Sequence, residues 1–244
     1  MIRFLGVCVE NFIECLKYLF GGNVRLKTVI SQAASISYDS LPISLVIAFI
    51  SAAVIAIQVS KQFLMSGAEA YIGGTITVVM IREIAPGFVA LAIGARAGTA
   101  ISAEIANMQV TSQVDAIKTL KINPVGYYFT PRIIASAITV PMVVMIAEFI
   151  GISGGMLVSN MTIGLHPARY WNSAWAWMFT KDIYVSLLKG CIFGGLIALV
   201  CASKGYETKG GAKEVGTSTT QAAILSTIYM LVADFLINLL FYIA

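Results

Sequence analysis

Charged residues are scarce in this chain: aspartate, glutamate, lysine and arginine together make up 11% of its 244 residues. A water-soluble domain usually carries about 25% charged residues, so this sequence has less than half the charge that a water-facing surface needs. Hydrophobic residues make up 58%, and at about 20 residues per span there is room for several membrane-spanning helices. The composition therefore excludes an ordinary soluble domain and predicts an all-α integral membrane protein.

Histidine and paired cysteines are also lacking. His166 is the one histidine, a polar residue in an expected loop, and the four cysteines form no CxxC pair or Cys/His cluster. This excludes the usual metal and disulfide patterns, and no catalytic cluster of histidine, cysteine and carboxylate is evident. A G-x-x-x-x-G-K-[ST] loop is missing too, so the chain is not expected to bind ATP in the P-loop manner. We expect no cofactor and no metal on this chain.

The net charge of +4 has two interpretations. In a nucleic-acid-binding protein it would indicate a basic face. In a membrane protein it reflects lysine and arginine retained on cytoplasmic loops, and this second interpretation is favoured, so no nucleic-acid partner is expected.

The first 36 residues predict an amphipathic helix that lies in the membrane interface. Its hydrophobic positions recur every three or four residues, which marks one face of a helix: Leu5, Cys8, Val9, Phe12, Ile13, Leu16, Leu19 and Phe20. Glu10, Glu14 and Lys17 interrupt the run, unlike the apolar core of a cleaved signal peptide. An interfacial position suits this pattern, and a helix packed on protein remains the alternative.

Five membrane spans are expected within residues 41–244, at about 41–59 (opened by Pro42), 75–101, 133–158, 183–202 and 222 to the C-terminus. Glu148 lies inside the third span and Asp234 inside the fifth, and a loop rich in aromatic residues is expected at about 170–179. No soluble linker or repeat interrupts the chain, which predicts one membrane domain over residues 1–244.

Basic residues indicate how these spans are oriented. With the N-terminus in the cytoplasm, the outer loops hold only Lys61, Arg169 and Lys181, while most other lysines and arginines fall on cytoplasmic segments. Five spans then place the C-terminus in the periplasm. The tryptophans near 171–177 fall at the outer interface, as an aromatic belt would.

Arg82 and Glu83 interrupt the second span. A charge at the bilayer centre costs at least about 2.5 kcal/mol, so such residues normally face a protein interior or a wet cavity. Adjacent residues point about 100° apart on a helix, so partners on another helix or on a second copy are expected. Snorkelling near a helix end is the alternative.

Three G-x-x-x-G pairs, at 94/98, 151/155 and 190/194, predict close helix packing.

From about 103 to 122 hydrophobic and polar residues alternate as on an amphipathic helix, ended by Asn123 and Pro124. By composition alone this helix could simply rest on the bilayer.

The segment 82–132 contains the motifs R-E-x-x-P, A-x-R-x-G-x-A-x-x-A-E, M-x-x-T-x-Q-x-x-A, D/N-P and P-R. They are formed by Arg82, Glu83, Pro86, Ala95, Arg96, Gly98, Ala100, Ala103, Glu104, Met108, Thr111, Gln113, Ala116, Pro124, Pro131 and Arg132. In this order the motifs resemble the pattern of the MlaE/YrbE family of ABC permeases. A second block, 205–222, is similar to the loop before the family's last span at Gly205, Tyr206, Gly211, Val215, Gly216, Thr219 and Thr220.

This resemblance implies a homodimeric permease subunit in the cell inner membrane that moves phospholipids or related lipids. A separate ABC ATPase would hold ATP, a periplasmic MCE-domain protein would exchange lipid, and an STAS-domain subunit is left open. Arg82 and Glu83 become candidates for the lipid cavity. A cytoplasmic coupling helix between spans two and three would contact the ATPase through Glu104, Met108, Thr111, Gln113 and Ala116.

Two other classes of protein are compatible with parts of the sequence. A secondary transporter or membrane enzyme could use Arg82, Glu83, Glu148 and Asp234, but secondary transporters often show internal repeats, and none is evident. A membrane scaffold fits the composition but leaves Arg82 and Glu83 unexplained.

Overall fold

The long apolar runs of the sequence form long helices. The computed structural model describes residues 2–21 and 24–243, and over these residues the chain is helical with no strand. Five helices are long and apolar enough to cross a membrane, at Leu26–Met65, Glu69–Val110, Pro124–Ile163, Thr180–Tyr206 and Ala212–Phe241. The prediction of an all-α membrane protein with about five spans is therefore confirmed.

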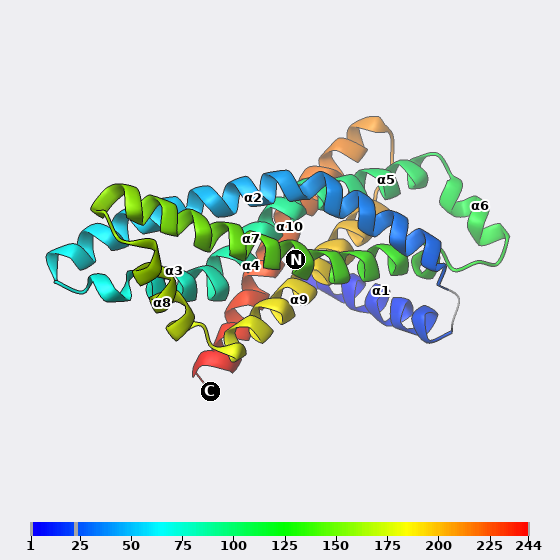
Figure 1. The fold of residues 1–244 in the computed structure, drawn as a ribbon. Coiled ribbons are helices and arrows are strands. Elements are labelled where there is room, and N and C mark those ends of the chain that lie inside the picture. Colours follow the sequence, from blue (N-terminus) through cyan, green and yellow to red (C-terminus); the bar gives the residue numbers. More distant parts are fainter. Residues whose placement is uncertain (1, 22–23, 244) are drawn as a thin grey trace. The chain divides into compact units, whose positions relative to one another are not determined.

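The elements follow one another along the chain as Figure 1 shows. They are α1 (Ile2–Phe20), α2 (Leu26–Met65), η1 (Glu69–Tyr71), α3 (Ile72–Val79), η2 (Met80–Ile84), α4 (Ala85–Ile93), η3 (Gly94–Gly98), α5 (Thr99–Val110), α6 (Gln113–Thr119), α7 (Pro124–Ile163), α8 (Pro167–Trp177), α9 (Thr180–Tyr206), α10 (Ala212–Asn238) and η4 (Leu239–Ile243). The second span is thus one run of helix in which η2 and η3 are π-helical turns.

Two sequence-based expectations about these elements are wrong. Pro42 does not open the first span, because α2 begins at Leu26 and contains Pro42; in membrane helices neighbouring groups satisfy the backbone that a proline frees. The aromatic segment is a helix and not a loop. His166 is the N-cap of α8 and accepts a hydrogen bond from the Ala168 amide, with Pro167 in the first turn, which is a favoured start for a helix.

The chain forms two compact units, each built from parts of the long helices. The first comprises Met1–Ser40, Ile93–Val140 and Cys191–Ala244, and the second Leu41–Ala92 and Pro141–Gly190. The boundaries fall within α2, α4, α7 and α9. The expected division into an interfacial region at 1–36 and a bundle at 41–244 stays a prediction.

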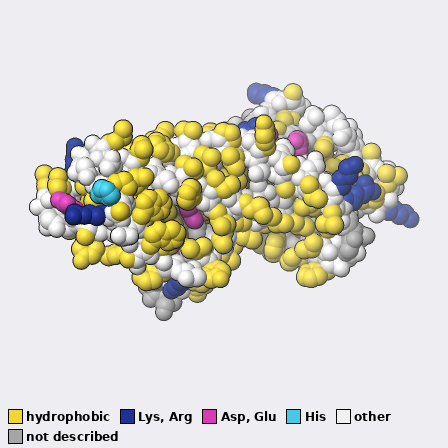
Figure 2. Space-filling model, viewed as in Figure 1, with side chains coloured by type: hydrophobic (Ala, Val, Ile, Leu, Met, Phe, Trp, Pro, Cys, Tyr) yellow, Lys and Arg dark blue, Asp and Glu magenta, His cyan; other side chains and the backbone are white. Residues whose placement is uncertain are grey.

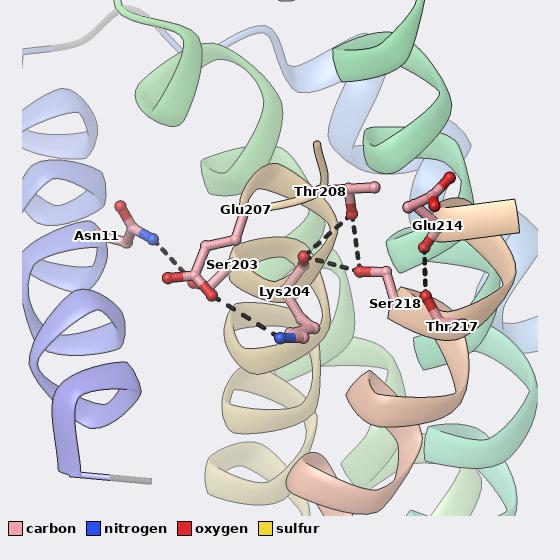
Figure 3. A network of polar contacts seen from close by, with 8 residues as sticks. All are labelled: Asn11, Ser203, Lys204, Glu207, Thr208, Glu214, Thr217 and Ser218. Carbon is pink, nitrogen blue, oxygen red and sulfur yellow. Dashed lines mark hydrogen bonds and ion pairs between the residues drawn. The ribbon is translucent and has the colours of Figure 1, made fainter. Parts of the chain in front are cut away.

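In the first unit, α1 has two different faces. Phe4 and Cys8 are buried against Val200 of α9, and the Asn11 amide donates a 2.9 Å hydrogen bond to the Ser203 hydroxyl, as Figure 3 shows. A second row of hydrophobic side chains stays exposed: Leu5, Val9, Phe12, Ile13, Leu16, Leu19 and Phe20. The helix therefore packs on protein along one face and has an apolar face left over, which suits an interfacial helix.

Exposed hydrophobic side chains also cover the spans. They cover much of the face visible in Figure 2, where charged side chains occur in only a few places. Such a surface would be unstable in water and is the surface that a bilayer covers.

Glycines allow the close helix contacts that the G-x-x-x-G pairs predicted. A Cβ atom at Gly98 would lie 2.9 Å from the Cys201 sulfur, and one at Gly194 would lie 2.4 Å from the Ser136 carbonyl oxygen, both in the first unit. In the second unit, a Cβ atom at Gly155 would lie 2.9 Å from the Tyr170 hydroxyl. The prediction of tight packing is confirmed at these positions.

Candidate functional site

The charged pair of the second span lies on a π-helical turn. Arg82 and Glu83 belong to η2, where the Ala85 amide bonds to the Met80 carbonyl, five residues back. A π turn inserts one residue into a helix and changes which side chains face a neighbour, and such turns are frequent at functional sites. The turn sits in an apolar helix, so the two charges depend on neighbouring groups.

Both charges have partners on α9, within the second unit. An Arg82 nitrogen donates a 3.0 Å hydrogen bond to the Asp182 carboxylate. The Lys189 ammonium donates to the Glu83 carboxylate at 3.1 Å and to the Arg82 carbonyl at 2.7 Å. The expectation that partners lie on another helix is confirmed. No feature of the sequence analysis had identified Asp182 or Lys189 as those partners.

The α9 partners are buried, whereas the η2 residues are partly exposed. Side-chain exposure is 2% for Asp182 and 0% for Lys189, against 34% for Arg82 and 45% for Glu83. A buried charge is tolerated only when it is paired and hydrogen-bonded. Asp182 and Lys189 therefore hold Arg82 and Glu83 in place and leave them partly accessible at the surface of this unit.

A third polar contact lies between the two ion pairs along α9. The Ser186 hydroxyl donates a hydrogen bond to the Glu148 carboxylate of α7, and Glu148 is buried. Asp182, Ser186 and Lys189 follow the i, i+4, i+7 spacing of one helix face. That spacing within an apolar run is the sequence signal that could have revealed the stripe.

This polar stripe resembles a binding or positioning element more than a catalytic centre. In this stripe, two cations each face a carboxylate. Over the described residues, no group of three histidine, cysteine or acidic residues could hold a metal ion. A partly exposed guanidinium beside a carboxylate can instead bind the polar part of an amphiphile.

The segment expected as one coupling helix at 103–122 is divided in two. Helix α5 ends at Val110, Ser112 adopts a left-handed backbone with φ of 59°, and α6 begins at Gln113. Lys121 has a second positive φ of 58°. Non-glycine residues adopt this conformation mainly at turns, so the alternating pattern of the sequence hid a sharp change of direction.

The five coupling candidates consequently fall on different elements of the first unit. Glu104 lies on α5 and accepts a 2.7 Å hydrogen bond from Arg132 of α7. Met108, also on α5, is half-buried beside a hollow that Tyr18 and Tyr127 also line. Thr111 in the turn, and Gln113 and Ala116 on α6, are exposed.

Helix α6 is held by a buried anchor and a lysine. Val114 is fully buried. The Lys118 ammonium donates a 3.1 Å hydrogen bond to Asp115 and lies 5.7 Å from the centroid of the Tyr206 ring, at the end of α9. The hydrogen bond to Asp115 raises the pKa of Lys118, so the lysine keeps its charge. This leaves the rest of α6 available on the surface.

The second motif block forms the turn between α9 and α10, shown in Figure 3. The Thr208 hydroxyl donates a hydrogen bond to the Ser218 hydroxyl at 2.8 Å. The Lys204 carbonyl accepts a hydrogen bond from the Ser218 hydroxyl at 2.9 Å and a longer one from Thr208. The Glu214 carboxylate accepts a 2.9 Å hydrogen bond from the Gly211 amide at the start of α10. Gly205 lies against α5, where a Cβ atom would be 2.5 Å from the Ser102 carbonyl oxygen. This block therefore has a structural role.

Comparison with known proteins gives consistent matches. The family model described as Permease MlaE matches residues 29–240. The probable ABC transporter permease protein slr1045 of Synechocystis is 32% identical over 92% of this chain and 86% of its own length. The probable ABC transporter permease protein RP096 of Rickettsia prowazekii is 36% identical over 89% and 84%. The Arabidopsis protein TRIGALACTOSYLDIACYLGLYCEROL 1, chloroplastic, is 29% identical over 91% of this chain and 63% of its own.

Proposed function

Because this chain belongs to the MlaE permease family, we propose that it moves phospholipids or related lipids between the inner membrane and a periplasmic MCE-domain partner, as the permease subunit of an ABC transporter. The chain is a transport subunit and not an enzyme, so ATP hydrolysis takes place on a separate subunit. The Arabidopsis relative carries the name of a galactolipid, which supports lipid as the cargo.

The observation that carries this proposal is the pair of ion-paired, partly exposed charges in an apolar span. Arg82 and Glu83 keep 34% and 45% of their side chains exposed while Asp182 and Lys189 are buried. A lipid has a polar headgroup and apolar chains. In the proposed cavity, Arg82 and Glu83 would contact the headgroup, and the apolar side chains of the span would contact the chains. A second copy of the chain closes the cavity over this patch in the proposed homodimer.

The exposed part of the 111–119 segment is the proposed ATPase contact. Thr111, Gln113 and Ala116 are exposed, and Lys118 connects α6 to Tyr206 at the end of α9. The basic residues of the short loops support a cytoplasmic position for this segment, with the N-terminus inside and the C-terminus in the periplasm.

A reconstituted system tests the proposal. The chain, its ATPase and its MCE-domain partner are placed in proteoliposomes, and transfer of a fluorescent phospholipid to the MCE protein is followed with and without ATP. The double variant Arg82→Gln/Glu83→Gln should slow ATP-dependent transfer by about tenfold or more, because it removes charge-assisted contacts worth about 1.5–3 kcal/mol each.

Glu69→Gln is the matched control, since Glu69 is a partly exposed acid in the same unit. It should transfer lipid at the wild-type rate. Transfer that does not depend on ATP, or a double variant as active as the control, would contradict the proposal.

A further inference from the structure

A hollow in the second unit lies next to the polar stripe, and the four residues of the two ion pairs do not line it. It has a volume of about 210 Å³ and lies among α7, α8 and neighbouring segments, lined by Met145, Glu148, Phe149, Trp171, Trp175 and Met178 together with three isoleucines. Sites for drug-sized ligands measure about 300–1,000 Å³. A hollow of this size suits a smaller group, such as the headgroup of a lipid.

Its lining combines a buried acid with exposed aromatic side chains. Glu148 is 8% exposed, whereas Phe149 and Trp175 at the rim are each 65% exposed. Trp171 and Trp175 are one helical turn apart on α8, with ring centroids 6.2 Å apart and planes inclined by 31°. Aromatic faces next to a carboxylate are the groups that recognise alkylammonium ions.

The charges of this unit leave a place for a cation at Glu148. Arg82 is paired with Asp182, and Lys189 with Glu83. Among the described residues, the partner of Glu148 is the neutral Ser186 hydroxyl, and no ion pair to Glu148 is found there. A buried carboxylate is stabilised by an opposite charge, and a bound ligand can supply that charge.

The tryptophans also indicate the level in the membrane at which the hollow lies. Tryptophan gathers at the level of the lipid headgroups in membrane proteins, and all three tryptophans of the chain lie on α8. A headgroup is therefore the part of a lipid that reaches this hollow, while its acyl chains lie along the exposed apolar side chains of α7.

We propose that the hollow formed by Glu148, Trp171 and Trp175 binds the ammonium headgroup of a zwitterionic phospholipid. The Glu148 carboxylate pairs with the ammonium, the indole faces contact its alkyl groups, and Ser186 keeps the carboxylate in position. This binding does not depend on transport, since it requires neither ATP nor a second subunit.

Tryptophan fluorescence of the purified chain in maltoside micelles tests the proposal without a transport assay. Dihexanoylphosphatidylcholine should change the emission saturably. Dihexanoylphosphatidylglycerol, which has the same chains and no ammonium, should not. Choline chloride supplies the ammonium without a lipid, and an equal response to it would overturn the assignment to a lipid headgroup.

Single substitutions distinguish the contribution of the carboxylate to binding from that of the indoles. Glu148→Gln keeps the size and the hydrogen bond from Ser186, and it should weaken binding of the phosphatidylcholine by about tenfold or more. Trp175→Phe should weaken it several-fold, while Trp177→Phe, outside the hollow, should leave it unchanged. Glu69→Gln serves as the control for loss of one partly exposed carboxylate elsewhere in the unit.

The tryptophan variants keep the test decisive if Glu148→Gln does not fold. Equal affinity for phosphatidylcholine and phosphatidylglycerol, or a Trp175→Phe variant that binds as well as wild type, would overturn the proposal. If the reconstituted wild-type system shows no ATP-dependent lipid transfer while the purified chain still binds the headgroup, that result counts against the proposed function and not against this site.

Discussion

The contact between Lys189 and Glu83 allows a direct test of whether Glu83 faces a wet cavity. Lys189 is fully buried, whereas 45% of the Glu83 side chain is exposed. Removal of either residue breaks this ion pair, and the charge that remains stands in different surroundings in the two cases. The two single variants should therefore differ in stability.

Glu83→Leu leaves a buried ammonium with the Arg82 carbonyl as one remaining acceptor. Breaking a buried ion pair in this way costs about 3–5 kcal/mol. Lys189→Met fills a similar volume and leaves the exposed carboxylate of Glu83. If that carboxylate is hydrated, Lys189→Met should lower the free energy of unfolding by only about 1–2 kcal/mol. If the carboxylate faces hydrocarbon, the decrease should reach about 3 kcal/mol or more.

Unfolding by sodium dodecyl sulfate in mixed micelles, followed by tryptophan fluorescence, measures these differences, because the three tryptophans lie on α8 in the same unit. The double variant Lys189→Met/Glu83→Leu should be more stable than Glu83→Leu alone, since neither charge of the ion pair remains in it. If Lys189→Met is destabilised as much as Glu83→Leu, Glu83 does not face a wet cavity. That result would refute the assignment of Glu83 to the cavity.

Four further predictions concern packing, coupling, topology and thiol chemistry. Gly205→Ala places a Cβ atom 2.5 Å from a backbone oxygen of α5 and should lower stability by about 1–3 kcal/mol in the same unfolding assay, whereas Gly87→Ala meets nothing within 4 Å and should not. Ala116→Trp on the exposed side of α6 should weaken co-purification of the ATPase without affecting membrane insertion; an unchanged yield for this and other exposed positions of α6 would contradict the coupling role. A reporter fused after Ala244 should be active in the periplasm, and cytoplasmic activity would exclude the proposed orientation. Burial raises the pKa of the Cys15 thiol to about 11, so little thiolate is present near neutral pH. In a variant with the exposed Cys191 replaced by alanine, maleimide labelling of Cys15, located by peptide mapping, should be slow at about pH 7 and increase with pH toward that value. Rapid labelling of Cys15 at neutral pH would show that the thiol is not buried.

Hydropathy and spacing were sufficient for the fold class. A low charge content and five long apolar runs require helices that satisfy their own backbone in lipid, and the five span candidates follow from that requirement. The apolar spacing of α1 and the G-x-x-x-G pairs likewise depend only on helical periodicity, and the structure confirms both.

Helix boundaries depended on local conformation that the pattern of residues does not reveal. Pro42 lies inside α2, and the amphipathic pattern of 103–122 continues across the left-handed turn at Ser112. Periodicity records which side of a helix is apolar and gives no sign of one residue with a positive φ. The matched pairs of the polar stripe were hidden for a related reason, because they join segments about 100 residues apart.

The sequence by itself determined that this is a helical membrane protein with two charges, Arg82 and Glu83, inside an apolar span, since the cost of a bare charge in lipid follows from composition and position alone. Only the tertiary structure decided how that cost is met. It placed Asp182 and Lys189 of α9 against the π turn that carries the two charges, and it brought Glu148 together with Trp171 and Trp175 in the lining of one hollow. Which side chains meet across two helices is set by the packing of the helices, and a pattern along one segment cannot specify its neighbour.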